Sequence, residues 1–276
     1  MKGKGLQTGK PVEAFFYPAA DGEGISFVRK DLKKKPPIRL LDLGCLKFDA
    51  DRRSIVRADA ENYVETVEHL LAALWGAGIS NIKIELDSSE PPAMDGSARE
   101  FLEALKKAGI KKQNSEKSFI KIKEPVWVEE KNSFLGIFPS DIYKISYIFE
   151  HPYAACGRQS FSEVLSPDLF REKIAPARTL WFVPPGPGTI EEKAEAVRKQ
   201  GYGRGADSEN TLVIDENKIV NLPRFPDEPV RHGVLDLIGD LYLLNRPIRG
   251  RIIAIRSGHK LNLELVKKIN ERYACK

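Results

Sequence analysis

The sequence has few cysteines and histidines, and it has no long apolar run. Its three cysteines are Cys45, Cys156 and Cys275. They are odd in number and share no CxxC spacing, which argues against a disulfide framework and against a cysteine zinc site. No stretch reaches the roughly 18 apolar residues of a membrane-spanning helix, and residues 1–5 lead into no signal-peptide core. These absences predict a protein of the reducing cytoplasm.

The composition is that of a globular chain with a mild positive charge. The 276 residues suffice for one large domain or two of ordinary size, and 42% hydrophobic and 30% charged residues exclude a disordered protein. A net charge of +5 permits a phosphate-bearing substrate or transient contact with an anionic membrane surface. Because the sequence has no basic-aromatic array, nucleic acid binding is not expected, and a basic binding module is the weakest functional alternative.

Residues 229–240 are predicted to form a helix that carries a metal site. On a helix His232 and Asp236 lie one turn apart and share a face, and Asp240 lies one further turn along it. An imidazole and a carboxylate that point the same way supply two of the three protein ligands of a catalytic zinc site. The alternative is a solvated helix face, on which such pairs are common.

A second histidine helix is predicted for residues 63–76, around His69. When His69 is aligned with His232, four further positions coincide: Val67 with Val230, Leu71 with Val234, Leu74 with Leu237, and Gly76 with Gly239. A β-like run follows each helix, at 82–86 and at 252–255. We interpret this as a divergent repeat of two related domains, whose helices could bring both histidines together. Chance similarity between two amphipathic helices is the alternative.

The rest of the chain predicts an α+β fold in two domains. The unpatterned polar stretch 111–117 predicts a boundary, with domains at residues 1–113 and 114–276. Ser97 and Glu100 have the spacing of a capping box that opens a helix closing at Gly109. Period-two patterns predict strands, and a final helix is expected at 261–273; the strands are 12–17, 25–28, 119–122, 126–128, 134–138 and 143–149.

A βαβ-like insertion is predicted at about residues 180–222, with a helix at 190–199 and a strand at 211–214. Its glycine-rich turn contains Gly203 and Arg204, whose backbone N–H groups could receive a phosphate or sugar. An ordinary flexible turn is an equal alternative.

Two further residues are candidates for acid–base chemistry. Glu68 directly precedes His69 and points about 100° away from it on a helix, where a carboxylate can lie over a metal-bound water. His259, expected in the loop before the last helix, could titrate near neutral pH and act as an acid or electrostatic partner. The alternatives are a surface charge for Glu68 and a helix-capping surface residue for His259.

Five segments, in order over nearly the whole chain, closely resemble the UDP-3-O-acyl-N-acetylglucosamine deacetylases, the zinc amidases of lipid A biosynthesis. Each segment alone is modest, and their combination is specific. The segments are 66–74 (TVEHLLAAL), 94–98 (MDGSA), 177–179 (ART), 231–243 (RHGVLDLIGDLYL) and 257–259 (SGH).

The resemblance implies two α+β domains of similar topology, with helices packed between two outer sheets and the active site at the domain interface. It implies zinc, or iron(II) in the cell, held by His69, His232 and Asp236, with Glu68 as general base. It also assigns roles at the reacting carbonyl: His259 with its partner Asp240 would stabilise the oxyanion or protonate the leaving amine, and Thr179 would bind the tetrahedral intermediate.

The same resemblance implies the substrate, an acylated UDP-glucosamine that loses acetate. The enzyme is expected to be a monomer, and the insertion is expected to form a channel for the acyl chain.

Three positions depart from the family pattern. Gly233 stands where a lysine normally follows the second zinc histidine, Leu180 where the family has phenylalanine, and Gln7 where a histidine is usual. The chain also begins near Gln7 without the strand that the family usually has upstream, which leaves a truncated gene start or a shorter first sheet as alternatives. The missing lysine keeps open a divergent member with a different amide substrate or reduced activity, and Arg204 is a candidate for replacing the lost charge.

Overall fold

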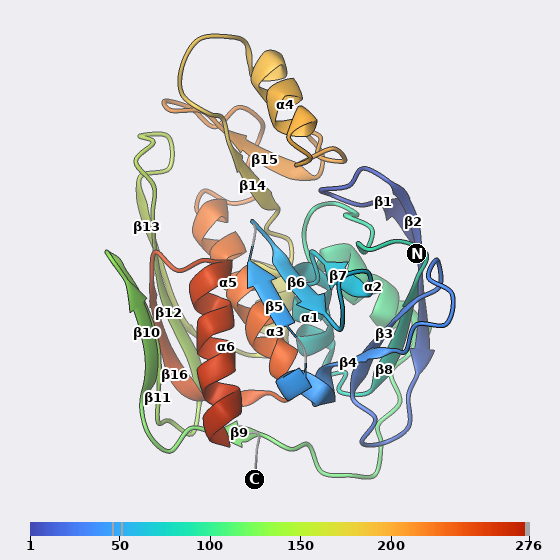
Figure 1. Ribbon diagram of the computed structural model, residues 1–276. Helices are drawn as coiled ribbons and strands as arrows, with labels where there is room; N and C mark the ends of the chain where they lie inside the picture. The colour runs from blue at the N-terminus through green and yellow to red at the C-terminus, as the bar shows by residue number, and fades with distance from the viewer. Residues whose placement is uncertain (46, 51, 274–276) are drawn as a thin grey trace.

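The computed structural model describes residues 1–45, 47–50 and 52–273, and two β-sheets form its outer layers (Figure 1). The first sheet has five strands, in the order β1 (Lys2–Lys4), β2 (Pro11–Pro18), β8 (Ile82–Leu86), β3 (Ile25–Arg29) and β4 (Ile38–Arg39). The second has the order β10 (Val126–Glu130), β11 (Ser133–Phe138), β16 (Ile248–Ile255), β12 (Tyr143–Glu150) and β13 (Arg158–Val164), and β9 (Ile120–Lys121) also pairs with β16.

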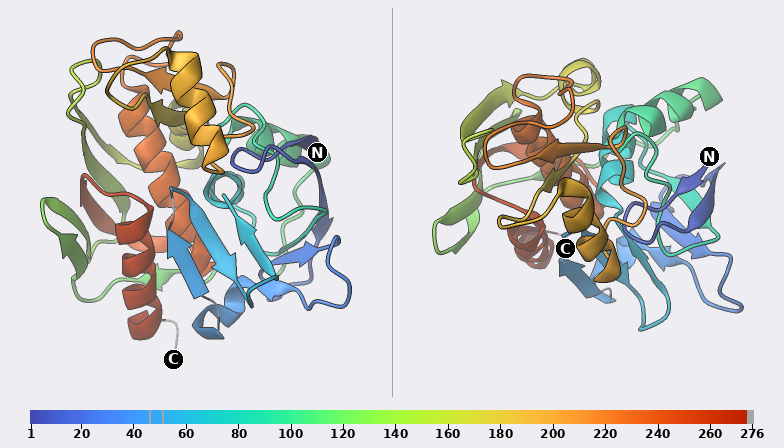
Figure 2. Two further views of the ribbon diagram at one scale, coloured as in Figure 1. Left: turned by 45° about the horizontal axis from the view of Figure 1, so that its top comes forward. Right: turned by 90° about the horizontal axis from the view of Figure 1, so that it is seen from above.

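Helices fill the space between the two sheets, which confirms the predicted α+β class (Figures 1 and 2). The main helices are α1 (Glu68–Ala77), α2 (Arg99–Ala108), α5 (Glu228–Leu241) and α6 (His259–Tyr273). Shorter helical segments are η1 (Leu40–Cys45), α3 (Pro167–Leu169), the π-helical η2 (Phe170–Ile174) and η3 (Tyr242–Leu244). Among the described residues, none of the helices has the length and apolar character that crossing a membrane requires.

The two sheets share one topology. In the first, β8 is antiparallel to β2 and parallel to β3; in the second, β16 is antiparallel to β11 and parallel to β12. The central strand follows the histidine helix in both halves, since β8 follows α1 and β16 follows α5. This agreement supports the internal repeat that the sequence suggests. A boundary near residue 113 stays a prediction, and it falls between α2 and β9.

Each half carries an insertion between its histidine helix and the outer-sheet strand that comes before this helix, which is β4 in the first half and β13 in the second. In the first half this is a small antiparallel sheet of β5 (Lys47–Ala50), β6 (Ser54–Arg57) and β7 (Tyr63–Glu65). In the second half it is a βαβ unit, in which α4 (Ile190–Lys199) connects two parallel strands, β14 (Thr179–Phe182) and β15 (Thr211–Ile214). The βαβ unit lies at one end of the molecule, above the helix layer (Figure 1).

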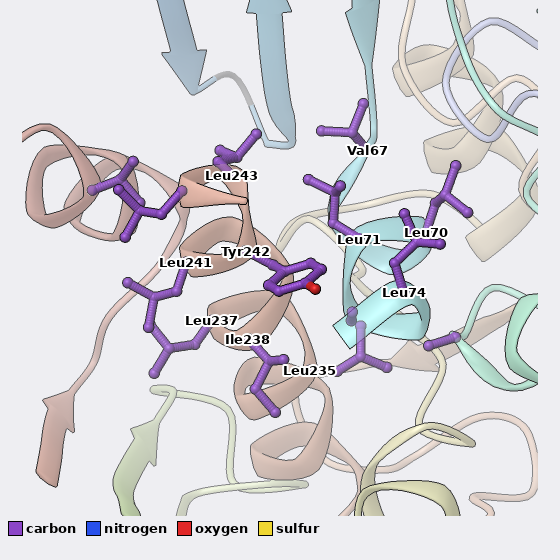
Figure 3. Packing of buried hydrophobic residues seen from close by; sticks show 14 of the residues in the cluster. Val67, Leu70, Leu71, Leu74, Leu235, Leu237, Ile238, Leu241, Tyr242 and Leu243 are labelled. Atoms are coloured by element: carbon purple, nitrogen blue, oxygen red, sulfur yellow. The ribbon is translucent and has the colours of Figure 1, made fainter. Parts of the chain in front are cut away.

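The contact between α1 and α5 forms the centre of the hydrophobic core. Leu71 and Leu74 of α1 and Ile238 of α5 belong to one buried cluster, and the ring of Tyr242 lies between the two helices (Figure 3). The hydroxyl of Tyr242 donates to the carbonyl of Ile79, 2.8 Å away, so the polar end of this buried ring is satisfied. Each fully buried side chain of this size contributes roughly 1.5–3 kcal/mol.

Two glycines that the repeat aligns make close contacts of different kinds. A Cβ atom on Gly239 would lie 2.0 Å from the carbonyl oxygen of Glu68, so glycine at this position lets α5 pack against the first turn of α1. A Cβ atom on Gly76 would lie 2.3 Å from the ring of Phe170. The aligned positions therefore share the need for a small residue but not the neighbour.

Two predicted helix starts were wrong. Residues 63–65 form β7 and α1 begins at Glu68, because Thr66 has a positive φ of 53° that interrupts the chain between them. The capping box is absent, and α2 begins at Arg99. The hydroxyl of Ser97 instead donates to Asp95, 2.7 Å away, and accepts from the backbone N–H of Arg99.

Candidate metal centre and active site

Three predicted metal ligands meet where α1 and α5 cross. His69 belongs to the first turn of α1, and His232 and Asp236 share a face of α5. The Nε2 atoms of the two histidines each lie 3.4 Å from a different oxygen of Asp236. One donor atom from each residue lies within 4.8 Å of the other two. The close packing at Gly239 positions these side chains, because it sets how near α5 approaches α1.

The three residues fit a divalent cation. Asp236 Oδ1 is buried and accepts no hydrogen bond from the described residues, an arrangement that is costly unless a cation satisfies the oxygen. Two imidazoles and one carboxylate form a three-ligand set of the kind that leaves a position open for catalysis. Burial raises the pKa of Asp236, but the neighbouring His232 and His259 lower it by more and keep the carboxylate ionised.

The orientation of His232 is fixed by the second half of the molecule. Its Nδ1 lies 3.2 Å from the carbonyl oxygen of Ala177, which can only accept a hydrogen bond. The proton is therefore on Nδ1, and the lone pair of Nε2 points toward Asp236. Burial lowers the pKa of His232, which favours the neutral imidazole that a metal ligand requires.

Glu68 lies beside the ligands in a buried position. Its Oε2 accepts a hydrogen bond from the backbone N–H of Ser54, 3.1 Å away, and its Oε1 lies 3.9 Å from His259 Nε2. Burial raises the pKa of Glu68 to about 7, against the opposing effect of His259 and His69. A carboxylate with a pKa near neutrality can accept and return a proton at physiological pH.

His259 and Asp240 form a hydrogen-bonded pair, and the His259 ring lies near both Glu68 and Asp236. His259 is the first residue of α6, so its predicted place in the preceding loop was wrong. Its Nδ1 donates to Asp240 Oδ2 at 2.9 Å, and its Nε2 lies 3.7 Å from Asp236. Burial lowers the pKa of His259, but the carboxylates of Asp240 and Asp236 outweigh burial and hold the pKa well above its usual value. The imidazole is therefore a cation aimed at the metal centre.

Thr179 and Leu180 line a cavity in the βαβ unit, two and three residues after Ala177, which contacts His232. The backbone N–H of Thr179 donates to the carbonyl of Gly96 at 2.8 Å, and the two residues begin β14. The cavity has a volume of about 340 Å³. Its apolar lining comes mainly from the insertion: Leu180, Trp181, Ile190, Ala194, Val197, Tyr202, Ala206 and Val213.

The glycine-rich turn does not offer free N–H groups to a phosphate. The N–H of Gly203 donates to Gln7 Oε1 at 2.9 Å, and that of Arg204 to the carbonyl of Gln7 at 3.2 Å. Gly203 lines the cavity, whereas Arg204 does not, and the Arg204 side chain donates to the carbonyl of Arg198. The first half of the chain occupies both N–H groups, and the binding of a phosphate or sugar at this turn stays a prediction.

The family of the chain follows from comparison with known proteins. The family model of LpxC, UDP-3-O-acyl N-acetylglycosamine deacetylase, matches residues 1–271. The chain belongs to the LpxC family. Proteins named UDP-3-O-acyl-N-acetylglucosamine deacetylase share this assignment: one from Coxiella burnetii (strain CbuK_Q154) is 38% identical over 97% of this chain and 86% of its own length. Another, from Anaeromyxobacter sp. (strain Fw109-5), is 37% identical over 99% of this chain and 86% of its own length.

In this LpxC family member, two residues near the centre were not found from the sequence. Ser54 contacts Glu68 through its backbone and Asp240 through its hydroxyl. Asn262 donates to Asp240 Oδ2 at 2.8 Å. The position of Asn262, three residues after His259 on one helix face, was a usable signal. Ser54 has no comparable signal, because its partner Asp240 lies 186 residues away.

The family departure at Gly233 has a structural counterpart in Tyr147. A Cβ atom on Gly233 would lie 3.1 Å from both Cζ and the hydroxyl oxygen of Tyr147. Tyr147 is 2% exposed, and its hydroxyl donates to the carbonyl of Ser257 at 2.5 Å. The ring of Tyr147 thus packs against the partly exposed Gly233, so a side chain at position 233 of this LpxC site requires a shift of the ring by a few tenths of an ångström.

Proposed function

We propose that this protein is a metal-dependent deacetylase that hydrolyses the acetamide of UDP-3-O-acyl-N-acetylglucosamine, releasing acetate, in lipid A biosynthesis. The observation that carries the proposal is the convergence of His69, His232 and Asp236, from two halves of a chain that matches the family model over residues 1–271. We further propose zinc as the metal, with iron(II) as the alternative in the cell. The enzyme acts as a cytoplasmic monomer with at most transient contact with the membrane surface.

The ligand set supports zinc through its chemistry. A divalent cation held by two imidazoles and a carboxylate supplies a Lewis acid and lowers the pKa of a bound water to about 7. The chain contributes the orientation of the ligands. Ala177 holds the His232 ring, and the packing of α5 on α1 sets the distance between His69 and His232. These contacts fix the three donor atoms before any cation binds.

Glu68 is the proposed general base. Its buried carboxylate has a pKa raised to about 7, and its Oε1 lies 3.9 Å from His259 Nε2. It accepts the proton of the attacking water and can pass a proton on to the leaving amine. The Ser54 N–H binds Oε2 of Glu68, so Oε1 remains available to accept and transfer the proton.

His259 is the proposed electrostatic partner of the developing oxyanion or the acid for the leaving amine. Its Nε2 faces the centre, while Nδ1 is bound by Asp240. A preorganised cation beside a charge that develops during the reaction is often the largest single catalytic contribution. Thr179 is proposed to contact the tetrahedral intermediate, and Leu180 and Gly203 belong to the cavity that we propose for the acyl chain.

Metal content and acetate release test the proposal together. The purified native protein should contain about one zinc or iron(II) per chain, and it should release acetate from the acylated UDP-sugar. A chelator should abolish acetate release, and added zinc should restore it, because the ligands are protein side chains that persist without the ion. A folded native protein that carries no metal and is unaffected by the chelator would refute the proposal.

The alternative is a divergent family member that keeps the metal site but acts on another amide or has reduced activity. Gly233 favours this alternative, because it replaces the cation expected next to His232. Acetate release by the wild-type protein with a kcat in the usual enzyme range of about 1–10³ s⁻¹ would exclude it.

Restoring lysine at position 233 is expected to destabilise the protein without a gain in activity. Tyr147 lies 3.1 Å from the position of the new Cβ, so Gly233→Lys overpacks the site at a cost of about 1–3 kcal/mol, of which the gain from replacing a helix-interior glycine offsets about 1 kcal/mol. Chemical denaturation and acetate release measure the two effects. The double variant Gly233→Lys, Tyr147→Leu should regain stability relative to the single one. A large activity gain in the single variant would contradict this expectation and would identify an impaired enzyme.

A further inference from the structure

Ser54 is a fully buried serine that connects the two halves of the site. It begins β6 in the small sheet of the first half, and its exposure is 0%. Its carbonyl accepts from the N–H of Thr66 at 2.9 Å, so its backbone is fixed by the residue two positions before Glu68. No motif in the sequence and no family segment described above includes it.

The side chain of Ser54 is bound to the carboxylate that holds His259. Its Oγ donates to Asp240 Oδ1 at 2.5 Å, while Asp240 Oδ2 accepts from His259 Nδ1 at 2.9 Å and from Asn262 at 2.8 Å. Both oxygens of Asp240 are thereby occupied. The carboxylate cannot rotate without breaking a buried hydrogen bond, and the imidazole that it binds keeps one orientation.

The backbone of Ser54 is bound to the other acid–base group. Its N–H donates to Glu68 Oε2 at 3.1 Å, and Glu68 Oε1 then lies 3.9 Å from His259 Nε2. One residue therefore sets the position of Glu68 through its backbone and that of His259 through Asp240. Because Ser54 comes from the first half and His259 from the second, the same contacts also hold the halves in register.

We propose that Ser54 is a positioning residue for the deacetylation, which fixes the distance between the proton acceptor Glu68 and the cationic His259. The inference rests on the proposed function of the site. It requires no contact between Ser54 and the substrate. Removal of the hydroxyl releases Asp240 Oδ1 and lets the His259 ring shift away from the geometry that the reaction needs, whereas substrate binding is unaffected.

The test compares Ser54→Ala, Ser54→Thr and the control Ser89→Ala in the metal-loaded, full-length protein. Ser89 makes a serine-to-carboxylate hydrogen bond of the same kind, with Glu65 at 2.8 Å. Loss of one hydrogen bond to a charged group predicts a fall in kcat of about tenfold or more for Ser54→Ala. KM and metal content should stay at wild-type values. Ser54→Thr keeps the hydroxyl and should recover most of kcat, and Ser89→Ala should leave kcat unchanged.

A second readout does not depend on activity. The chain has only four histidines, so protein with ¹⁵N-labelled histidine gives a simple imidazole spectrum. Ser54→Ala should shift the Nδ1–H resonance of His259 and leave the imidazole ¹⁵N resonances of His151, which stacks on Phe182, in place. If the threonine variant does not fold, Ser54→Cys takes its place, with a weaker donor and an intermediate kcat expected.

The outcomes separate the two proposals. Unchanged kcat in Ser54→Ala, an equal loss in the alanine and hydroxyl-bearing variants, or loss of metal would each overturn the positioning role. If the wild-type protein releases no acetate, the proposed function fails. In that case an unmoved His259 resonance overturns the role of Ser54, and a shifted one supports it.

Discussion

Replacing Glu68 by glutamine is expected to lower kcat by about 10²–10⁴-fold while the metal content stays at the wild-type value. Glutamine has the shape of glutamate, and its amide oxygen can still accept the hydrogen bond from the N–H of Ser54. It cannot accept a proton from water, so only proton transfer is lost. Steady-state acetate release and metal analysis of the same preparation measure the two quantities.

The control for this variant is Glu61→Gln, which changes an exposed glutamate that pairs with Lys35 at the surface. It should keep wild-type kcat and metal content. If Glu68→Gln retained a kcat within a few fold of the wild type, the general base would have to be a group other than Glu68.

Replacing His232 by alanine is expected to remove both the metal and the activity. The side chain is buried, supplies one of three proposed ligands and is held by Ala177, so its loss leaves only His69 and Asp236 to hold the metal. Metal analysis should show well under half an equivalent per chain, and acetate release should fall below detection. Circular dichroism establishes that the variant is folded.

His151→Ala is the matched control for the loss of an imidazole. His151 stacks on Phe182 with ring centroids 3.7 Å apart, and its Nδ1 accepts from the N–H of Tyr153. This variant should keep the metal and the activity. Retention of a full equivalent of metal in His232→Ala would contradict the proposed ligand set.

The fold was predictable where local pattern and burial agree. The period-two pattern of large apolar residues over 143–149 predicted β12, and α4 and β15 lie at the predicted positions. The two helices of the first half begin later than predicted because of local interactions and backbone angles that the hydrophobic pattern does not show. The hydroxyl of Ser97, which a capping box would use, donates its hydrogen bond to the nearby carboxylate of Asp95 instead. At Thr66 the backbone adopts a positive φ.

The metal ligands could be predicted because their spacing and their repetition are visible in the chain. His232 and Asp236 are separated by one helical turn, and His69 was found through its alignment with His232. Contacts between distant segments gave no such signal. Ser54 and Asp240 are 186 residues apart, and the N–H of Gly203 is bound by Gln7 at a separation of 196 residues. At such separations along the chain, only the packing of the two halves decides which donor meets which acceptor.

The common strand order of the two sheets bears on the ancestry of this protein. A single ancestral unit that paired with its own copy about a twofold axis would bring two equivalent histidines together at the interface between the copies. The alignment of His69 with His232 places Ala73 opposite Asp236 and Arg231 opposite Glu68. Gene duplication and fusion would then have freed each copy to specialise, one supplying the third ligand and the other the carboxylate beside it. The chemical asymmetry of the site is in this sense younger than the symmetry of the scaffold.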